Sequence, residues 1–264
     1  MSGLKNKPRI LFYDIETSPL AAWVWRPGKQ VVRHGQLMKG HTRYGIICIT
    51  YCFNDGKPAK VISWDFQEQD TARVVSDFDT IVREYNPDVI IGKNSDRFDN
   101  KHLNSVRMYE GLDAFPEFME MTDDLEKQMR KYFYLPSYTL DYFSEELGLG
   151  GKMKMCFQDW IDIITRCPEQ GEKSLKKMCT YGKKDIVDTR ALWNHCIAHC
   201  KPKFNAATKL GMRACTNCGS EDVRKNGTRV SGKTTYQNFY CNSHHGHAGK
   251  APVSMKGTIG KIGA

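Results

Sequence analysis

The stretch YDIETSPL, residues 13–20, decides the fold of this chain. The apolar run RILFY (residues 9–13) leads into it and is rich in strand-forming residues. In a strand, residues i and i+2 point to the same face, so Asp14 and Glu16 converge while Ile15 faces the core. Two carboxylates at the edge of an apolar core repel each other and lose hydration, and a cation relieves both penalties. We therefore predict a buried strand that ends in a metal-binding acid pair.

The segments downstream alternate between strand and helix patterns. Further strands are predicted at residues 45–53 and 60–64, joined by a hairpin turn, and then a helix over 70–85. The remaining predicted elements are a strand over 88–92, a helix over 100–109, a strand over 118–121, and helices over 123–133, 139–147 and 173–199. The first strands follow one another directly, and the later strands are separated by helices. This order indicates an α/β domain with a mixed sheet.

The charge distribution divides the chain near residue 200. From Lys201 onward there are 11 Lys and Arg residues against two acids, so this segment carries the whole net charge of +9. We predict two domains, residues 1–200 and residues 201–264, the second ending in a flexible tail from about Gly246. A basic segment beside a neutral body favours a polyanion partner, although it can also serve solubility alone.

The composition is that of a globular protein, with 264 residues and 40% hydrophobic content. No apolar run approaches the roughly 20 residues that span a bilayer, and the first residues lack the apolar core of a signal peptide. We therefore expect a cytoplasmic location and no membrane partner. The ten cysteines are expected to be reduced thiols, since nothing directs export to an oxidising compartment.

Two later clusters supply more acids. Asp96 and Asp99 follow the fourth predicted strand, at the edge of the sheet where α/β sites form, and either can instead be a helix N-cap. In the last long helix, Tyr181 and Asp185 are four residues apart and share a face. Asp188, one turn further on, is assigned to the solvated side or to a salt bridge.

Three stretches resemble a known family. In order and separation, YDIETSPL, IGKNSDRFDNKHL (residues 91–103) and YGKKD (residues 181–185) resemble the exonuclease motifs of the DEDD (DnaQ-like) superfamily, which includes proofreading domains of DNA polymerases. Tyr181 fits the tyrosine version of the third motif, because the histidine version would need histidine where Thr180 stands. The resemblance covers roughly the first 200 residues and implies an RNase H-like mixed β-sheet flanked by helices.

The resemblance also implies a role for individual residues. Four carboxylates would hold the catalytic cations: Asp14, Glu16, Asp99 and Asp185. Tyr181 would orient the attacking water. Asn94 and Phe98 match the framing positions of the second motif, which favours Asp99 over Asp96 as the ligand.

The implied activity is metal-dependent 3′–5′ exonucleolytic hydrolysis of phosphodiester bonds, with single-stranded DNA favoured over RNA. Two cations about 3.5 to 4 Å apart can stabilise both the entering and the departing oxygen of such a reaction. Ligands that are all oxygen atoms select hard cations, so two Mg²⁺ or Mn²⁺ ions are expected. The direction and the end preference rest on the resemblance alone.

A basic, aromatic segment over residues 23–45 follows the first acid pair. It places two tryptophans among cations: Trp23, Trp25, Arg26, Lys29 and Arg33. Aromatic side chains interleaved with cations suit a single strand of nucleic acid, because rings stack on bases while cations follow phosphates. The alternative is an exposed loop with one buried tryptophan.

A Cys/His cluster near the C-terminus predicts a structural zinc site. Its ligands are predicted to be Cys215, Cys218, Cys241 and His244. A CxxC pair with a second half about two dozen residues later has the spacing of a tetrahedral zinc site and resembles a zinc ribbon. His245 and His247 are alternative fourth ligands. One Zn²⁺ would supply much of the folding energy of so short a module.

Two other functions compete with the exonuclease. One is a catalytically silent nucleic-acid binding protein on a nuclease fold, which the retention of all four acids and the tyrosine disfavours. The other is an accessory subunit in replication or repair, with the zinc ribbon as a docking module for a protein partner. The combination of motifs resembles small phage or bacterial nucleases.

Overall fold

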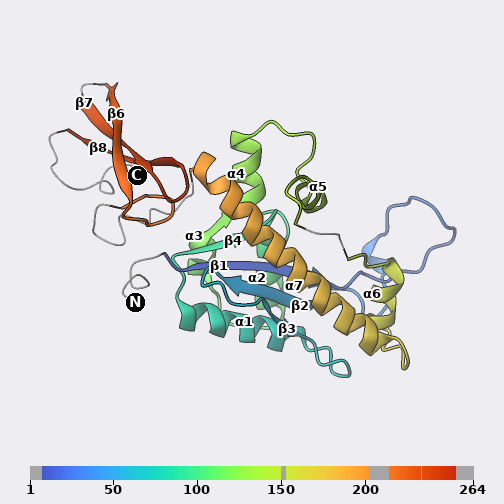
Figure 1. The fold of residues 1–264 in the computed structure, drawn as a ribbon. Helices are drawn as coiled ribbons and strands as arrows, with labels where there is room; N and C mark the ends of the chain where they lie inside the picture. The colour runs from blue at the N-terminus through green and yellow to red at the C-terminus, as the bar shows by residue number, and fades with distance from the viewer. Residues whose placement is uncertain (1–7, 150–152, 202–213, 233, 254–264) are drawn as a thin grey trace.

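The computed structural model describes residues 8–149, 153–201, 214–232 and 234–253. Within these ranges the strands form two separate sheets (Figure 1). The larger sheet contains β1 (Ile10–Thr17), β2 (Ile46–Phe53), β3 (Lys60–Ser63), β4 (Val89–Gly92) and β5 (Thr122–Asp124). The smaller sheet contains β6 (Val223–Ser231), β7 (Thr234–Cys241) and β8 (Gly246–Pro252).

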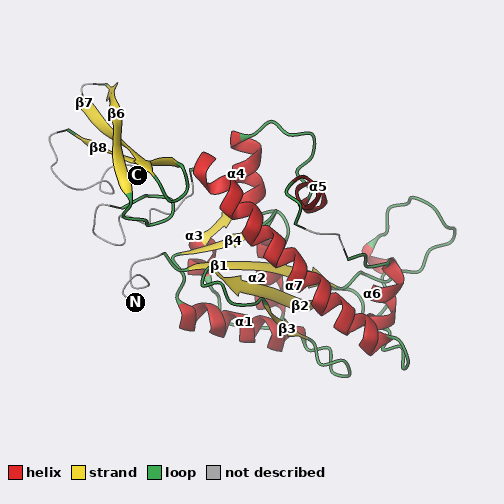
Figure 2. Cartoon of the chain, viewed as in Figure 1, coloured by secondary structure: helices red, strands yellow, loops and turns green. Residues whose placement is uncertain are grey.

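The helices of the described residues flank the larger sheet (Figure 2). They are α1 (Thr71–Tyr85), α2 (Asp99–Tyr109), α3 (Pro116–Met121), α4 (Leu125–Tyr132), α5 (Leu140–Glu146), α6 (Phe157–Ile164), α7 (Gly171–Cys196) and the short 3-10 helices η1 (His34–Gln36) and η2 (Ile197–His199). The longest of them, α7, crosses the sheet from one end to the other (Figure 1).

The larger sheet is mixed, with strand order β3-β2-β1-β4-β5. The first three strands pair antiparallel, whereas β4 runs parallel to β1 and β5 runs parallel to β4. This architecture confirms the predicted RNase H-like fold class.

Alternate residues of β1 face opposite layers of helices. The ring of Tyr13 packs against Phe78 of α1, with ring centres 5.6 Å apart, whereas Phe12 packs edge-on against Trp193 of α7 at 6.5 Å. The alternation continues beyond the apolar run: Ile15 is buried in the core cluster that contains Phe78. The acids between these core residues are therefore directed toward the α7 face.

Several predicted elements need correction. The strand predicted at 118–121 is wrong: these residues belong to α3, which starts with Pro116 in the first turn where proline is tolerated, and the strand follows as β5. Helix α6 was not predicted. The predicted flexible tail is wrong over residues 246–252, which form β8, while residues 254–264 lie outside the described residues.

The small sheet packs against the end of α7. Its core consists of Phe239, Ala248 and Ala251 around the cysteines. Gly246 lies so close to Ala198 of η2 that an added Cβ would be 2.6 Å from the carbonyl oxygen of that residue. The division at residue 200 stays a prediction, because residues 202–213 lie outside the described part of the chain.

Candidate active site

Four predicted carboxylates lie close together around the acid pair of β1: Asp14, Glu16, Asp99 and Asp185. The backbone N–H of Ile15 donates a hydrogen bond to Asp99 Oδ1 (3.2 Å), which ties the start of α2 to β1. Asp99 is buried, with 2% of its surface exposed. Three elements distant in sequence therefore contribute acids to one place.

Burial and mutual repulsion raise the pKa values of the acids in this group. Burial and the charge of Asp185 raise the pKa of Asp14 to about 7. Burial, followed by the charges of Asp14 and Asp185, raises the pKa of Glu16 to about 9. The pKa of Asp99 is raised by burial and by Asp14. A group of carboxylates that disfavour one another's ionised forms is suited to hold cations.

Tyr181 belongs to the same group. Burial, the charge of Asp185 and a side-chain hydrogen bond with Asp185 raise the pKa of the Tyr181 phenol well above its usual value. The phenol therefore keeps its proton at neutral pH. The charges of Glu16 and Asp14 raise the same pKa further.

Gly182 brings this part of α7 close to the sheet. A Cβ at position 182 would lie 2.7 Å from Thr50 Cγ2, closer than any real contact allows. Thr50 is the cross-strand neighbour of Asp14 in the β1–β2 pair. The glycine of YGKKD thus lets Tyr181 and Asp185 approach the acids of β1.

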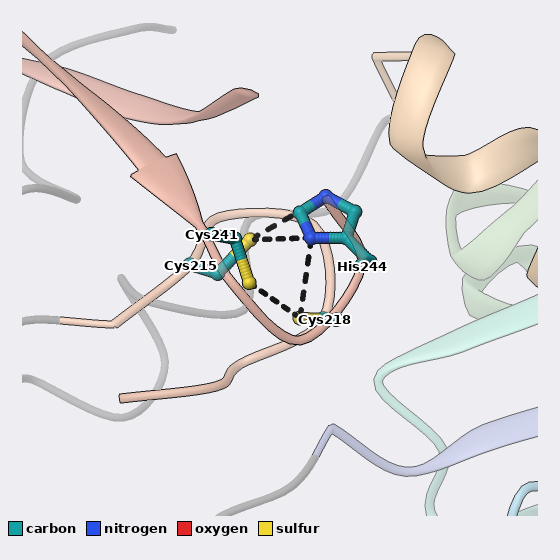
Figure 3. A group of neighbouring side chains, drawn as sticks. All are labelled: Cys215, Cys218, Cys241 and His244. Atoms are coloured by element: carbon teal, nitrogen blue, oxygen red, sulfur yellow. Dashed lines mark hydrogen bonds between the residues drawn. The ribbon is translucent and has the colours of Figure 1, made fainter. Parts of the chain in front are cut away.

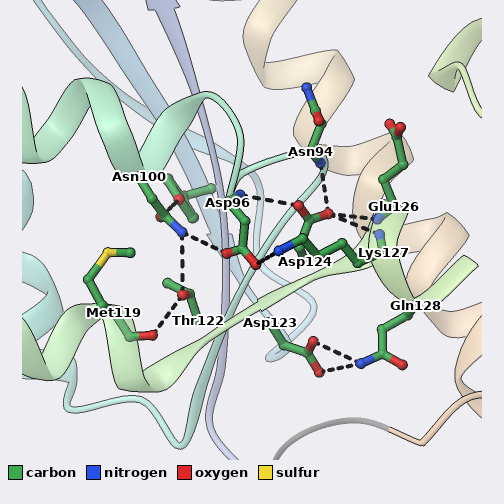
Figure 4. A network of polar contacts seen from close by, with 11 residues as sticks. Asn94, Asp96, Asn100, Met119, Thr122, Asp123, Asp124, Glu126, Lys127 and Gln128 are labelled. Carbon is green, nitrogen blue, oxygen red and sulfur yellow. Dashed lines mark hydrogen bonds and ion pairs between the residues drawn. The ribbon is translucent and has the colours of Figure 1, made fainter. Parts of the chain in front are cut away.

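Asp124 fixes the loop of the second motif (Figure 4). Its carboxylate accepts hydrogen bonds from the backbone N–H of Asn94 (3.0 Å) and of Asp96 (3.1 Å). It also caps α4 by accepting from the backbone N–H of Glu126 (2.9 Å). This role of Asp124 was not predicted, and its only signal in the sequence was an acid at the start of the helix predicted over 123–133. Asn94 itself adopts a left-handed conformation with φ of 60°.

The N-cap alternative for the second cluster is wrong. The N-cap of α2 is Phe98, without a side-chain hydrogen bond, and Asp99 stands in the first helical turn. Asp96 instead accepts hydrogen bonds from Asn100 Nδ2 (3.0 Å) and Lys127 Nζ (2.6 Å). Asp96 is therefore occupied by these partners, and Asp99 is the acid of this motif that joins the carboxylate group.

Asp188 forms the predicted salt bridge but is not solvated. Its carboxylate lies 2.8 Å from Lys184 Nζ and accepts a hydrogen bond from the Ser144 hydroxyl at 3.1 Å. It is buried, with 6% exposed. The solvated alternative is wrong because α5 covers this side of α7.

An aromatic row starts beside Asp99. The ring of Phe98, 40% exposed, lies 4.5 Å from the ring of His102, which in turn lies 5.0 Å from Tyr44, ring centre to ring centre. Burial lowers the pKa of His102, so this ring is neutral at pH 7. The row joins the second motif to the base of the segment that follows β1.

Both tryptophans of that segment are exposed. Trp23 is 73% exposed and Trp25 is fully exposed, so the alternative of one buried tryptophan is wrong. The segment folds back on itself through an antiparallel bridge between Ala22 and Leu37 and a hydrogen bond from Trp23 N to Gln36 O (2.8 Å). The cations Arg26, Lys29 and Arg33 are exposed as well.

The Cys/His cluster of the small sheet is assembled as a metal site (Figure 3). It consists of Cys215, Cys218, Cys241 and His244, whose ligand atoms all lie within 4.8 Å of one another. The Cys218 and Cys241 sulfur atoms are 3.7 Å apart, and His244 Nδ1 is 3.9 Å from Cys218 Sγ. Zn–S bonds of about 2.3 Å in a tetrahedron require sulfur atoms about 3.8 Å apart. The group could therefore bind zinc.

The two alternative histidines are not part of this group. His245 is exposed in a left-handed turn, and His247 pairs with Tyr240 on β8. A hydrogen bond with Cys215 and the proximity of His244 lower the pKa of Cys218 to about 4, which favours a thiolate. Among the described residues, this is the one set of three or more metal-ligating side chains gathered so tightly, and the four carboxylates are spread more widely.

Comparisons with known proteins point to DNA polymerases, although no protein-family model matches the chain. The DNA polymerase of Thermococcus litoralis is 30% identical over 175 residues, which are 56% of this chain and 10% of that protein. The DNA polymerase of Thermococcus sp. strain 9oN-7 is 29% identical over 173 residues, 56% of this chain and 21% of that protein. The chain thus spans only 10 to 21% of the length of these relatives.

The fold likeness extends further than the sequence likeness. The family B DNA polymerase of Pyrobaculum calidifontis matches 75% of this chain with a TM-score of 0.51 and 17% identity, over 27% of its own length. At this identity the likeness concerns the fold alone. No helix in the described part of the chain is long and apolar enough to cross a membrane.

Proposed function

We propose that this chain is a metal-dependent 3′–5′ exonuclease of the tyrosine-type DEDD superfamily. The observation that carries the proposal is the grouping of Asp14, Glu16, Asp99 and Asp185, in which Asp185 raises the pKa of Asp14, and Asp14 raises the pKa of Glu16 and of Asp99. The partial similarity to DNA polymerases supports a nucleic-acid enzyme. The resemblance of the three motifs supplies the direction of hydrolysis.

The carboxylates fit a pair of hard cations. They offer only oxygen atoms, and Lys93 is the one cation among the groups that shift the pKa of Asp14. Lys93 is itself paired with Glu126 at 2.9 Å, so much of the negative charge is left for metal ions. Two Mg²⁺ or Mn²⁺ ions held by the four acids would stabilise the charge that develops on the phosphate oxygens.

The protein groups then position the reactants. Tyr181 keeps its phenolic proton and is hydrogen-bonded to Asp185, so it can hold a water molecule at the acid group. Asp124 fixes the backbone of Asn94 and with it the loop that leads to Asp99. Phe98 is exposed beside Asp99 and offers a ring against which a terminal base can pack.

A single strand, with DNA favoured over RNA, is the proposed substrate. Trp23 and Trp25 are exposed among Arg26, Lys29 and Arg33, a combination that suits unpaired bases and their phosphates. The zinc ribbon over residues 214–253, held by the Cys/His group, is proposed as a second structural unit of the same protein.

The test uses 5′-labelled single-stranded DNA and RNA of equal sequence with Mg²⁺, and compares the native protein with Asp99→Asn and Asp96→Asn. A ladder that shortens from the 3′ end, is lost in Asp99→Asn and persists in Asp96→Asn is expected. Magnesium is omitted rather than chelated in the metal control, because a chelator would also strip the zinc site. Intact strands that still bind the native protein would instead indicate a nucleic-acid binding protein without catalysis.

A further inference from the structure

One face of the small sheet carries tyrosines that the zinc site and the proposed active site do not use. Along β7, Tyr236, Asn238 and Tyr240 share one face because side chains alternate in a strand. The residues between them face the other way: Phe239 is 6% exposed and Cys241 is buried in the metal group. The tyrosine face therefore lies opposite the metal and outside the core of the module.

Cations from the neighbouring strands surround both rings. Arg224 of β6 lies opposite Tyr240, and its guanidinium carbon is 4.7 Å from the centre of that ring. Lys250 of β8 places its Nζ 4.3 Å from the centre of the Tyr236 ring. Arg229 stands directly opposite Tyr236 on β6. Each tyrosine of this face is thus paired with at least one positive charge.

The face has no acid to balance these cations. The sequence contains no Asp or Glu from residue 223 to residue 253. The two acids before β6 lie at its start, where Asp222 is engaged: its backbone oxygen and its carboxylate accept from the backbone and the side-chain amide of Asn242 (3.0 and 2.8 Å). A surface of one sign with half-buried tyrosine rings is complementary to phosphates and bases.

We propose that the tyrosine face, defined by Arg224, Arg229, Tyr236, Tyr240 and Lys250, binds the single strand of nucleic acid that the chain degrades. The proposal rests on the proposed exonuclease function for its substrate. The cations can turn from the rings to phosphates, and the uncovered rings then stack on unpaired bases. A nucleic acid is the better fit than a protein partner, because the face combines three positive charges with no acid and so matches a partner whose charge is negative throughout.

The position of this face predicts a dependence on substrate length. The module packs at the C-terminal end of α7, and Asp185 is 12 residues before Ile197, the first residue after that helix. At about 1.5 Å per residue, the module begins about 18 Å from the acid group along the helix axis. A strand of only a few nucleotides can occupy the acid group without reaching the tyrosine face, whereas a strand of about twenty can engage both.

The test measures binding without hydrolysis, by fluorescence anisotropy of labelled (dT)20, (rU)20 and (dT)4 in Ca²⁺. Arg224→Gln is compared with Lys225→Gln, which removes the same charge from the neighbouring residue on the opposite face of β6, the side of Phe239. Tyr236→Ala and Tyr240→Ala are measured as well. Zinc content and the unfolding midpoint of each variant establish that the module is folded.

We expect each tyrosine variant to weaken binding of a 20-nucleotide strand by roughly five-fold or more. Arg224→Gln should also lower the salt dependence of log Kd by about 0.7, the value for one phosphate contact on a single strand. Lys225→Gln should leave both quantities unchanged, and no variant should alter the hydrolysis of (dT)4 in Mg²⁺. The relative loss on (dT)20 and (rU)20 shows which sugar the face prefers.

Equal losses in Arg224→Gln and Lys225→Gln, or no loss in the tyrosine variants, would overturn the proposal and leave the face to solvent or to a protein. The proposed exonuclease is judged separately, from turnover of (dT)4 in Mg²⁺. If the native protein binds (dT)20 through the tyrosine face but hydrolyses neither oligonucleotide, the exonuclease fails and the binding face stands. If (dT)4 is hydrolysed and the face variants bind normally, only the face fails.

Discussion

Asn217 Nδ2 donates a hydrogen bond to the carbonyl oxygen of Ile197 at 3.1 Å. The same amide donates to the carbonyl oxygen of Cys200 at 3.2 Å, so one side chain satisfies two acceptors beyond the end of α7. Asn217 lies between Cys215 and Cys218 and is 5% exposed. The segment between Cys215 and Cys218 and the end of the helix that carries Asp185 are therefore joined by a buried polar contact.

Replacing this side chain should loosen the junction. Asn217→Ala leaves two buried carbonyl oxygens without their donor, and we expect a loss of about 1 to 3 kcal/mol in the free energy of unfolding and faster release of zinc. Urea unfolding and a colorimetric zinc chelator measure the two effects. Asn242→Ala, which removes an exposed hydrogen bond to Asp222, is the matched control and should cost less than about 1 kcal/mol. Equal losses in the two variants would show that the buried hydrogen bonds of Asn217 stabilise the protein no more than an exposed one.

The buried ion pair between Arg107 and Asp79 joins α2 to α1. Arg107 Nε and a terminal nitrogen both donate to the Asp79 carboxylate, at 2.9 and 2.5 Å. Arg107→Met leaves a buried carboxylate without its partner and should cost about 3 to 5 kcal/mol in urea unfolding. Lys176→Met, which breaks an exposed pair on α7, should cost less than about 1 kcal/mol.

A second variant separates the pair from its packing. Arg107→Met combined with Asp79→Leu removes both charges, and we expect it to recover most of the lost stability because apolar replacements of a buried pair are often neutral. If the double variant is no more stable than the single one, the loss comes from packing around the Phe115 and Phe118 rings, which lie near the guanidinium group.

The sequence was most informative where the regular spacing of side chains along a strand or helix decided both which residues are buried and which acids lie together. Alternation along β1 predicted that Ile15 would be buried while Asp14 and Glu16 would share the other face. The structure confirms that the strand includes both acids and extends it by one residue, to Thr17. The spacing of Tyr181 and Asp185 likewise predicted that they would share a face of α7, and a side-chain hydrogen bond joins them.

The sequence was less informative where tertiary contacts decide the structure. Residues 118–121 are apolar enough for a strand, but Phe118 is fully buried on a helix that begins at Pro116. Asp124 gave no sign of its role, because its partners Asn94 and Asp96 lie about thirty residues earlier in the chain. The residues of β8 are rich in Gly and Lys and therefore resemble a flexible tail in the sequence. In the structure they form a strand because they pair with β7.

Asp159 predicts how stability changes in acid. Burial opposes its ionisation, but hydrogen bonds from Lys177 Nζ (2.7 Å) and from the backbone and thiol of Cys156 lower its pKa to about 2. An Asp in an unfolded chain has a pKa of about 3.9, so the folded state binds fewer protons between these values. The contribution of ionised Asp159 to the free energy of unfolding is therefore complete above about pH 4 and is lost as the pH falls through about 2.

Asp159→Asn should consequently lower the free energy of unfolding by roughly 1 to 2 kcal/mol at pH 6, and the difference from the native protein should shrink toward pH 2. Urea unfolding at several pH values measures this. Asp162→Asn, on the same helix, is the control and should show no such convergence. A difference that stays constant with pH would mean that the amide disturbs the start of α6 rather than removing the charge.

Gly182 offers the sharpest test of how α7 is held at the acid group. In Gly182→Ala the new methyl group would meet Thr50 Cγ2 at 2.7 Å, and neither the strand nor the β-branched side chain can yield easily. We expect a loss of about 1 to 3 kcal/mol in urea unfolding and a fall in the proposed nuclease activity, because Tyr181 and Asp185 would move away from Asp14. Thr50→Ala removes the obstructing methyl group together with a buried hydroxyl that has no hydrogen-bond partner. The double variant should therefore be more stable and more active than Gly182→Ala, with a coupling energy above about 0.5 kcal/mol. Additive effects would mean that the glycine serves the helix itself and not its approach to β2.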